Sequence, residues 1–307
     1  MFLVMGESLV DVISGGVTAP STHVGGSPLN VAIGLARLER PVTLVTRYGR
    51  DEYGDLIHQT LQDNGVQELL EPDELPTTTA HGILDPAGSA DYEFETVQWN
   101  LDGFVGVAAE RALEAAHGVH VGSLGAALEP GATSVRRAVQ EARPHATISY
   151  DPNVRPRLTP DRAAGRLRVE SFVALADVVR ASDADMAWLY PDRDPLDTAR
   201  SWLAAGPSVV ILTAGSEGAH GFTRNGDVHV PAVEADVEDT VGAGDSSMAA
   251  VLMGLDERGY IGAGRRDALR EIPKEELRQI MELATRASAI TVARAGANPP
   301  TLSELMA

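Results

Sequence analysis

The sequence alternates between short, β-branched apolar runs and longer helix-like segments over most of its 307 residues. Six runs have the composition of strands: Phe2–Met5, Val42–Thr46, Val119–Val121, Thr147–Tyr150, Val178–Ala181 and Val209–Thr213. Such runs are typical of parallel strands that are buried on both faces. The segments that favour helices are Pro28–Leu38, Glu52–Asn64, Val107–Ala116, Ala132–Ala142 and Pro195–Ala204. This alternation predicts an α/β fold, with a mainly parallel central sheet between two layers of helices.

The composition limits the classes of function that the chain can serve. Hydrophobic residues make up 44% of the sequence, which supports a large core, and we expect a single domain over residues 1–307. Because 44 acidic residues face 25 basic ones, the net charge of −19 disfavours nucleic acid and anionic membranes as partners. An anionic ligand must therefore be held by a local arrangement. The absence of cysteine excludes disulfides, thiolate metal sites and thiol catalysis.

The N-terminal stretch "MFLVMGESLVDV" has no basic region and meets acids at Glu7 and Asp11. This pattern predicts a first core strand in place of a signal peptide. An uncharged apolar run long enough to span a membrane does not occur in the sequence. We therefore expect a soluble, cytoplasmic protein.

One segment, residues 80–97, departs from the pattern of buried strands. Its second half alternates the aromatic residues Tyr92 and Phe94 with acids, and the turn residues "DPAGS" precede it. These features predict a half-exposed antiparallel hairpin, which pairs with the stretch Ser8–Val17 in a small second sheet. The pattern alone leaves open whether this hairpin is a surface decoration or a lid over a ligand.

The stretch "EDTVGAGDSS", residues 238–247, places small residues and a carboxylate just before a strongly apolar helix. Backbone N–H groups at a helix start have no partner within the helix and attract anions. Residues Gly242–Gly244 would let a phosphate approach the main chain, with Asp245 at the edge of the pocket as a general base. An ordinary tight turn with Asp245 as a helix-start carboxylate is the alternative. The sequence has neither a P-loop nor a G-x-G-x-x-G after its first strand, so P-loop and dinucleotide-binding proteins lose support.

Two stretches together resemble the signatures of a known family. "DTVGAGDSS" is similar to the C-terminal signature of the PfkB (ribokinase-like) carbohydrate kinases, and "VGGSPLNVAIGLARL", residues 24–38, is similar to their N-terminal signature. The resemblance continues through "GRDEYGD", "DPNVRP", "ILTAGSEGA" and "ARAGANPP", and it covers essentially the whole chain. "DPNVRP" looks most like the fructokinase branch.

The resemblance implies a Rossmann-like three-layer α/β sandwich with a small β-sheet lid, which would comprise residues 8–17 and 78–100. It implies ATP-dependent, Mg²⁺-assisted phosphorylation of a sugar hydroxyl, with fructose and fructose 6-phosphate as the first choice of substrate and product. The alternative acceptors are 2-keto-3-deoxygluconate, ribose and a nucleoside. A further alternative is an inactive sugar-binding regulatory protein on the same scaffold. Because the lid of relatives often mediates dimerisation, the resemblance also implies a homodimer through the lid.

The resemblance assigns roles residue by residue. Asp245 becomes the catalytic base, and the backbone of Gly242, Ala243 and Gly244 becomes the anion hole. The sugar-binding residues are Asp11, Gly25, Gly26, Asn30 and Arg155. The nucleotide-binding residues are Thr213, Gly215, Gly218 and Asn298. Without the family match, simpler structural roles remain open: helix entry at Pro28, a surface arginine at Arg155 and a hairpin turn at Gly215–Gly218.

Two implied metal sites complete the prediction. Asp239 and Val241 resemble positions that bind a monovalent cation, so the resemblance implies a potassium site there. Many relatives place Mg²⁺ and phosphate with an N-x-x-E motif, whereas this chain has Ser182 and Asp185 at the matching positions. Asp185 is expected to order metal-bound water, because hard oxygen ligands suit Mg²⁺.

Overall fold

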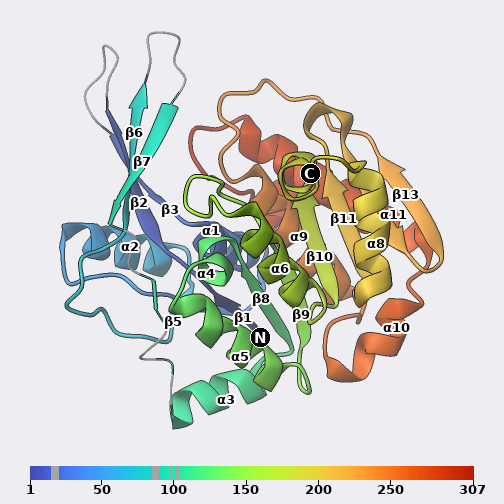
Figure 1. Cartoon of the computed structure of the whole chain (residues 1–307), viewed down its shortest axis with the longest axis horizontal. Helices are drawn as coiled ribbons and strands as arrows, with labels where there is room; N and C mark the ends of the chain where they lie inside the picture. Colours follow the sequence, from blue (N-terminus) through green and yellow to red (C-terminus); the bar gives the residue numbers. More distant parts are fainter. Residues whose placement is uncertain (15–20, 85–89, 97–98, 101–103, 105) are drawn as a thin grey trace.

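A nine-stranded sheet dominates the part of the chain that this computed structural model describes, namely residues 1–14, 21–84, 90–96, 99–100, 104 and 106–307 (Figure 1). Its strand order is β13-β12-β11-β10-β9-β8-β1-β4-β5, and the strands from β11 to β5 are parallel. Their bounds are β1 Phe2–Met5, β4 Val42–Val45, β5 Gln67–Glu68, β8 Gly118–Gly122, β9 Thr147–Asp151, β10 Val178–Ser182, β11 Val209–Thr213, β12 Ala219–Thr223 and β13 Gly226–Val230. The antiparallel strands β12 and β13 extend one edge. The prediction of a mainly parallel sheet is confirmed.

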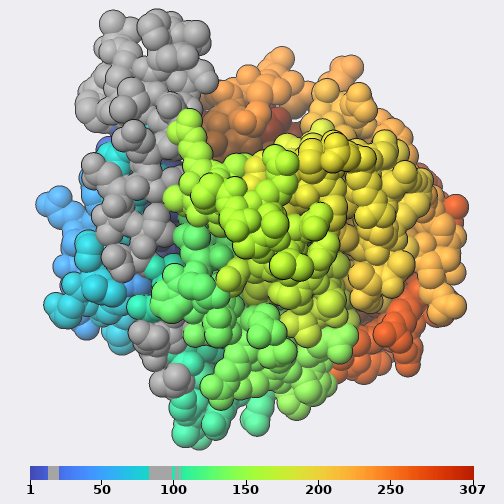
Figure 2. All heavy atoms as spheres, viewed as in Figure 1, coloured from blue at the N-terminus to red at the C-terminus, as the bar shows by residue number. Residues whose placement is uncertain are grey.

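Alternate residues of β1 face two different hydrophobic cores. Phe2 and Val4 belong to the core on one face of the sheet, while Leu3 and Met5 belong to the core on the other face. The first core contains residues of helices α1 Ser27–Arg37, α2 Glu52–Asp63, α9 Ala243–Glu257, α10 Arg266–Arg270, α11 Lys274–Val292 and α12 Leu302–Met306. The second contains residues of α3 Val107–Ala115, α4 Ser123–Ala127, α5 Gly131–Ala142, α6 Arg162–Val173, α7 Asp183–Leu189 and α8 Pro195–Ala205. The sheet is thus the middle layer of three, and Figure 2 shows the side that the second group covers.

A separate four-stranded sheet projects beside the main one (Figure 1). It consists of β2 Leu9–Ser14, β3 Ser21–Gly25, β6 Thr79–Leu84 and β7 Ala90–Thr96, in the order β3-β2-β6-β7. Strands β6 and β7 form the expected antiparallel hairpin, and β2 pairs with β6 in parallel. The predicted turn at residues 85–89, and residues 15–17, 97 and 98 of the predicted lid, lie outside the described part of the chain. Within the described residues, no helix is both long and apolar enough to span a bilayer.

Candidate active site

A cavity of about 1000 Å³ opens where the main sheet and the small sheet meet. One wall comes from the carboxyl ends of parallel strands, where ligands of open α/β sheets collect, and another comes from β2 and β3 of the small sheet. The N-terminus of α9 and residues 295–297 complete it. The predicted site residues that line the cavity are Asp11, Gly25, Gly26, Asn30, Arg155, Asp239, Val241, Gly242, Gly244 and Asp245. Sequence motifs that are far apart along the chain therefore share one cavity.

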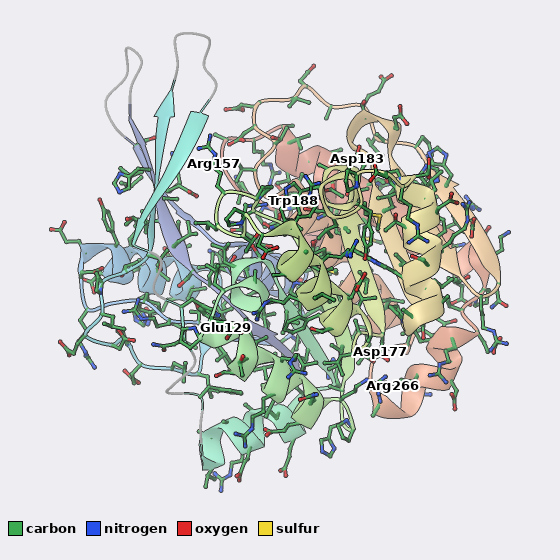
Figure 3. The ribbon with its side chains drawn as sticks, viewed as in Figure 1. Glu129, Arg157, Asp177, Asp183, Trp188 and Arg266 are labelled. Carbon is green, nitrogen blue, oxygen red and sulfur yellow. The ribbon has the colours of Figure 1, made fainter. Side chains whose placement is uncertain are left out.

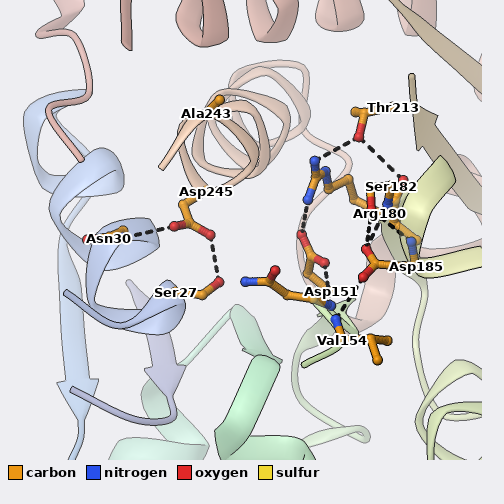
Figure 4. A network of polar contacts seen from close by, with 12 residues as sticks. Ser27, Asn30, Asp151, Val154, Arg180, Ser182, Asp185, Thr213, Ala243 and Asp245 are labelled. Carbon is orange, nitrogen blue, oxygen red and sulfur yellow. Dashed lines mark hydrogen bonds and ion pairs between the residues drawn. The ribbon is translucent and has the colours of Figure 1, made fainter. Parts of the chain in front are cut away.

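Asp245 is buried in the first turn of α9 and is held by two side chains of α1 (Figure 4). The Ser27 hydroxyl donates to its Oδ1 at 2.6 Å, and the Asn30 amide donates to its Oδ2 at 2.8 Å. Both bonds hold the carboxylate in a fixed orientation. The carboxylate is thus prepared to accept a further proton donor that enters the cavity.

The glycines ahead of Asp245 are required by the backbone and by their surroundings. Gly242 is the N-cap of α9 and has a φ of 77°, in the left-handed region that disfavours other residues. Gly244 lies against the guanidinium group of Arg180, because a Cβ built on this glycine would come within 2.5 Å of Arg180 Nη1. Within the described residues no side chain caps this helix start. The bare helix start therefore faces the cavity beside a cation.

The small sheet contributes the predicted sugar-binding residues. Asp11 on β2 lies opposite His23 on β3, and its Oδ2 is 2.6 Å from a Cβ built on Gly25. Burial raises the pKa of the Asp11 carboxyl to about 6, although nearby His23 and Arg155 lower it. Near neutral pH this carboxylate is an acceptor for hydroxyl groups at the cavity wall.

Arg155 and Asp239 lie at the rim of the cavity. Arg155 is exposed, and its Nη1 donates to Oδ1 of Asn153 at 2.6 Å. Asp239 accepts from the Val241 amide at 3.0 Å and from the Gly296 amide at 2.9 Å. The Asp239 carboxylate thereby ties the turn before α9 to the loop after α11, and the monovalent cation assigned to Asp239 and Val241 stays a prediction.

The remaining predicted residues are not among the described residues that line the cavity. Thr213 ends β11, and Gly215 and Gly218 belong to the tight connection from β11 to β12, so the hairpin turn is present. Asn298 accepts a bond from Arg37 at 2.5 Å through its Oδ1. Ala243 is the first residue of α9, so its backbone belongs to the helix start. The structure thus leaves the nucleotide contacts of these residues as predictions.

Asp185 is buried at the start of α7, where it forms a capping box with Ser182. Its Oδ2 accepts from the amide and the hydroxyl of Ser182, and its Oδ1 accepts from the Val154 amide at 2.8 Å. A carboxylate oxygen has two acceptor sites, so Oδ1 alone keeps spare capacity. This capacity fits contact with Mg²⁺ through a metal-bound water, and the Mg²⁺ role of Asp185 stays a prediction.

Three functional candidates were missed by the sequence reasoning: Ser27, Glu7 and Arg180. Ser27 stands in the stretch "VGGSPLNVAIGLARL" quoted above, and its hydroxyl group is the feature that could have identified it as a hydrogen-bonding residue of the site. Glu7 follows the first strand, is 4% exposed and accepts from the Gly125 amide at 2.7 Å. Arg180 lies inside an apolar strand pattern that gave no sign of a buried cation. All three line the cavity.

Replacing Glu7 with glutamine is expected to remove a pH dependence of stability. Burial raises the pKa of the Glu7 carboxyl from its ordinary value of 4.5 to about 7, against hydrogen bonds that lower it. Between these values the folded protein keeps a proton that the unfolded chain has lost. The contribution of Glu7 to stability is therefore complete below the ordinary pKa and is lost as the pH rises through about 7.

Thermal unfolding midpoints of the wild type and Glu7→Gln at about pH 5 and about pH 8 test this expectation. The wild type should lose stability relative to the variant between the two conditions, because the glutamine cannot ionise and can still accept the Gly125 bond. An equal difference between the two proteins at both pH values would contradict it.

Comparison with known proteins identifies the family. Residues 7–304 match the model of the pfkB family carbohydrate kinases. The chain belongs to this family. This carbohydrate kinase is 31% identical over 304 residues to the fructokinase of Escherichia coli, a match that covers 96% of the chain and 94% of that relative. It is therefore an enzyme, a phosphotransferase that acts on a carbohydrate.

Solved structures share its ribokinase-like fold. The fructokinase of Xylella fastidiosa with bound ATP has a TM-score of 0.88 at 24% identity, and the match covers 99% of this chain and 96% of the other. A fructokinase double mutant from Vibrio cholerae O395, in a form with fructose, ADP and potassium bound, has a TM-score of 0.77 at 23% identity. That match covers 99% of this chain and 94% of the other.

Proposed function

We propose that this kinase transfers the γ-phosphoryl group of ATP to the primary hydroxyl of fructose and forms fructose 6-phosphate. The observation that carries the proposal is the Asp245 carboxylate, fixed by Ser27 and Asn30 beside the bare start of α9 in the large cavity. Relatives at about 31% identity are fructokinases, and a related structure of the same fold holds fructose and ADP.

In the proposed reaction Asp245 accepts the proton of the primary hydroxyl as the sugar oxygen attacks the γ-phosphorus. The new bond joins the sugar oxygen to phosphorus, and the bond from phosphorus to the β,γ-bridging oxygen breaks. ADP leaves with that electron pair. The backbone at Gly242–Gly244 stabilises the oxygens of the group in transfer, as preorganised N–H donors do in other transfer reactions.

The sugar is proposed to lie against the wall formed by Asp11, Gly25, Gly26 and Asn30, with Arg155 at the rim. Carboxylate and amide groups suit hydroxyl recognition, since Asp11 accepts and Asn30 both donates and accepts. The small sheet would act as a lid that excludes water, a competing acceptor. A homodimer through this lid is part of the same proposal.

ATP is proposed to lie across the carboxyl edge of the sheet, along Thr213, Gly215 and Gly218 and toward Asn298. Asp185 would hold Mg²⁺ through water, and Asp239 with the Val241 backbone would hold potassium. When bound with ATP, Mg²⁺ would neutralise charge on the phosphate oxygens.

A coupled assay of ADP release across fructose, ribose, 2-keto-3-deoxygluconate and adenosine tests the acceptor. We expect the highest kcat/KM with fructose. Turnover of another acceptor in the absence of fructose turnover would contradict the fructokinase assignment and keep the kinase chemistry. ATP and sugar binding without any ADP release would favour the inactive regulatory protein.

A further inference from the structure

Arg180 is a buried cation that lines the cavity, and the chemistry proposed above gives it no role. It is 8% exposed and lies on β10, two residues before the strand ends. Its Nη1 donates to Asp151 at 2.8 Å, and its Nη2 donates to Thr213 at 2.7 Å (Figure 4). Burial lowers the pKa of Arg180, but the Asp151, Asp185 and Asp245 carboxylates together outweigh this effect, so the net pKa is raised. The group is therefore a permanent positive charge.

The hydrogen bonds of Arg180 are incomplete. Its Nε is buried and has no acceptor among the described residues. A guanidinium group has five N–H donors, and Asp151 and Thr213 take one each from Nη1 and Nη2. The second N–H of each of these two nitrogens is left for a ligand, whereas the buried Nε is not within its reach. Because the side chain lines the cavity, an oxygen-rich ligand has access to it.

The surroundings of Arg180 show where that ligand would lie. A Cβ built on Gly244 would come within 2.5 Å of Nη1 and 2.7 Å of Nη2, so the guanidinium rests directly on the helix start. The Asp245 carboxylate follows on the same turn of α9. A cation here offsets part of the negative charge of the Asp151, Asp185 and Asp245 carboxylates around it, which would otherwise repel a phosphate. The other arginines that line the cavity, Arg155 and Arg157, are exposed.

We propose that the Arg180 guanidinium is a catalytic group that binds the oxygens of the phosphoryl group in transfer, together with the backbone at Gly244. This inference rests on the proposed phosphoryl transfer and holds for any acceptor sugar. Arginine suits the role because its planar fork binds phosphate through two N–H groups.

The first test compares Arg180→Gln with Arg266→Gln. Arg266 is a matched control, because its guanidinium group also donates to a buried aspartate at 2.8 Å, in this case from Nε to Asp177. Asp177 precedes β10 at the amino end of the strand, and Figure 3 shows the pair far from Arg157 at the cavity. We expect Arg180→Gln to lower kcat by about 10²–10³-fold, the scale for loss of one transition-state donor. Arg266→Gln should keep the kcat of the folded enzyme.

The second test separates catalysis from structural neutralisation of Asp151. Arg180→Gln alone leaves Asp151 buried without its partner, which destabilises a protein strongly. The double variant Asp151→Asn, Arg180→Gln removes both charges. We expect it to regain much of the unfolding midpoint while kcat stays low. Recovery of kcat together with the midpoint would overturn the proposal, because Arg180 would then serve only to neutralise Asp151.

A binding measurement keeps the inference distinct from the acceptor assignment. The rise of the unfolding midpoint with added ATP needs no sugar turnover. This rise should be smaller in Arg180→Gln than in Arg266→Gln, even if none of the four acceptors releases ADP and the proposed function fails. Equal stabilisation of both variants by ATP, with equal kcat where turnover is measurable, would overturn the role of Arg180.

Discussion

Replacing Asp245 with alanine is expected to lower kcat by about 10²–10⁴-fold, the usual contribution of a positioned general base. The carboxylate is fixed by Ser27 and Asn30 at 2.6 and 2.8 Å and faces the cavity, so its loss removes the proton acceptor. Of the proposed sugar wall, Asp11, Gly25 and Gly26 are untouched, and Asn30 loses only its bond to Asp245. Sugar affinity, measured by calorimetric titration, should therefore stay close to that of the wild type while steady-state turnover collapses.

Asp256→Asn provides a matched control on the same helix. Asp256 lies at the far end of α9 and pairs with Arg40 at 3.4 Å, away from the residues that line the cavity. The kcat of Asp256→Asn should equal that of the wild type. If Asp245→Ala kept a kcat within about tenfold of the wild type, the proton would have to leave by another route, and the assignment of Asp245 would be wrong.

The layers of the fold could be predicted from the sequence because strands that are buried on both faces have a distinct apolar, β-branched composition. The predicted strand Val209–Thr213 has the same bounds as β11, and the predicted strand Val178–Ala181 is one residue shorter than β10. The strand Ser21–Gly25 was missed because its first three residues are polar and exposed, and therefore carry no apolar alternation. The small sheet depends on this strand, which pairs with β2. The small sheet was therefore predicted, but without strand β3.

The residues of the candidate site that stand in short sequence motifs were predicted. A contact that depends on how neighbouring strands are paired was missed. Asp245 and Asn30 were found because each stands in a family signature. The ion pair of Arg180 with Asp151 joins neighbouring strands that are paired in parallel, which no local pattern reveals. The capping box of Asp185 explains in turn why an acid suits that position even without a metal.

Replacing Gly244 with alanine is expected to lower kcat by about 10²–10³-fold, comparable to the loss of one transition-state donor. The added methyl would lie 2.5 Å from Arg180 Nη1, so the guanidinium must move away from the helix start. Because Arg180 is buried and donates to Asp151 and Thr213, this shift strains both bonds, and we expect a lower unfolding midpoint, offset only in part by the helix preference of alanine. The kcat is therefore compared at a temperature where both proteins are folded, and it should still fall by the stated factor.

The chain contains its own control for this variant. Residues Gly262–Gly264 repeat the tripeptide "GAG", but a Cβ built on Gly264 meets nothing within 4 Å. Gly264→Ala makes the same chemical change at the last position of the same tripeptide and should leave kcat unchanged. If both variants were equally active, neither the guanidinium nor the space above Gly244 would take part in phosphoryl transfer. A large loss confined to Gly244→Ala would place the reaction at the start of α9.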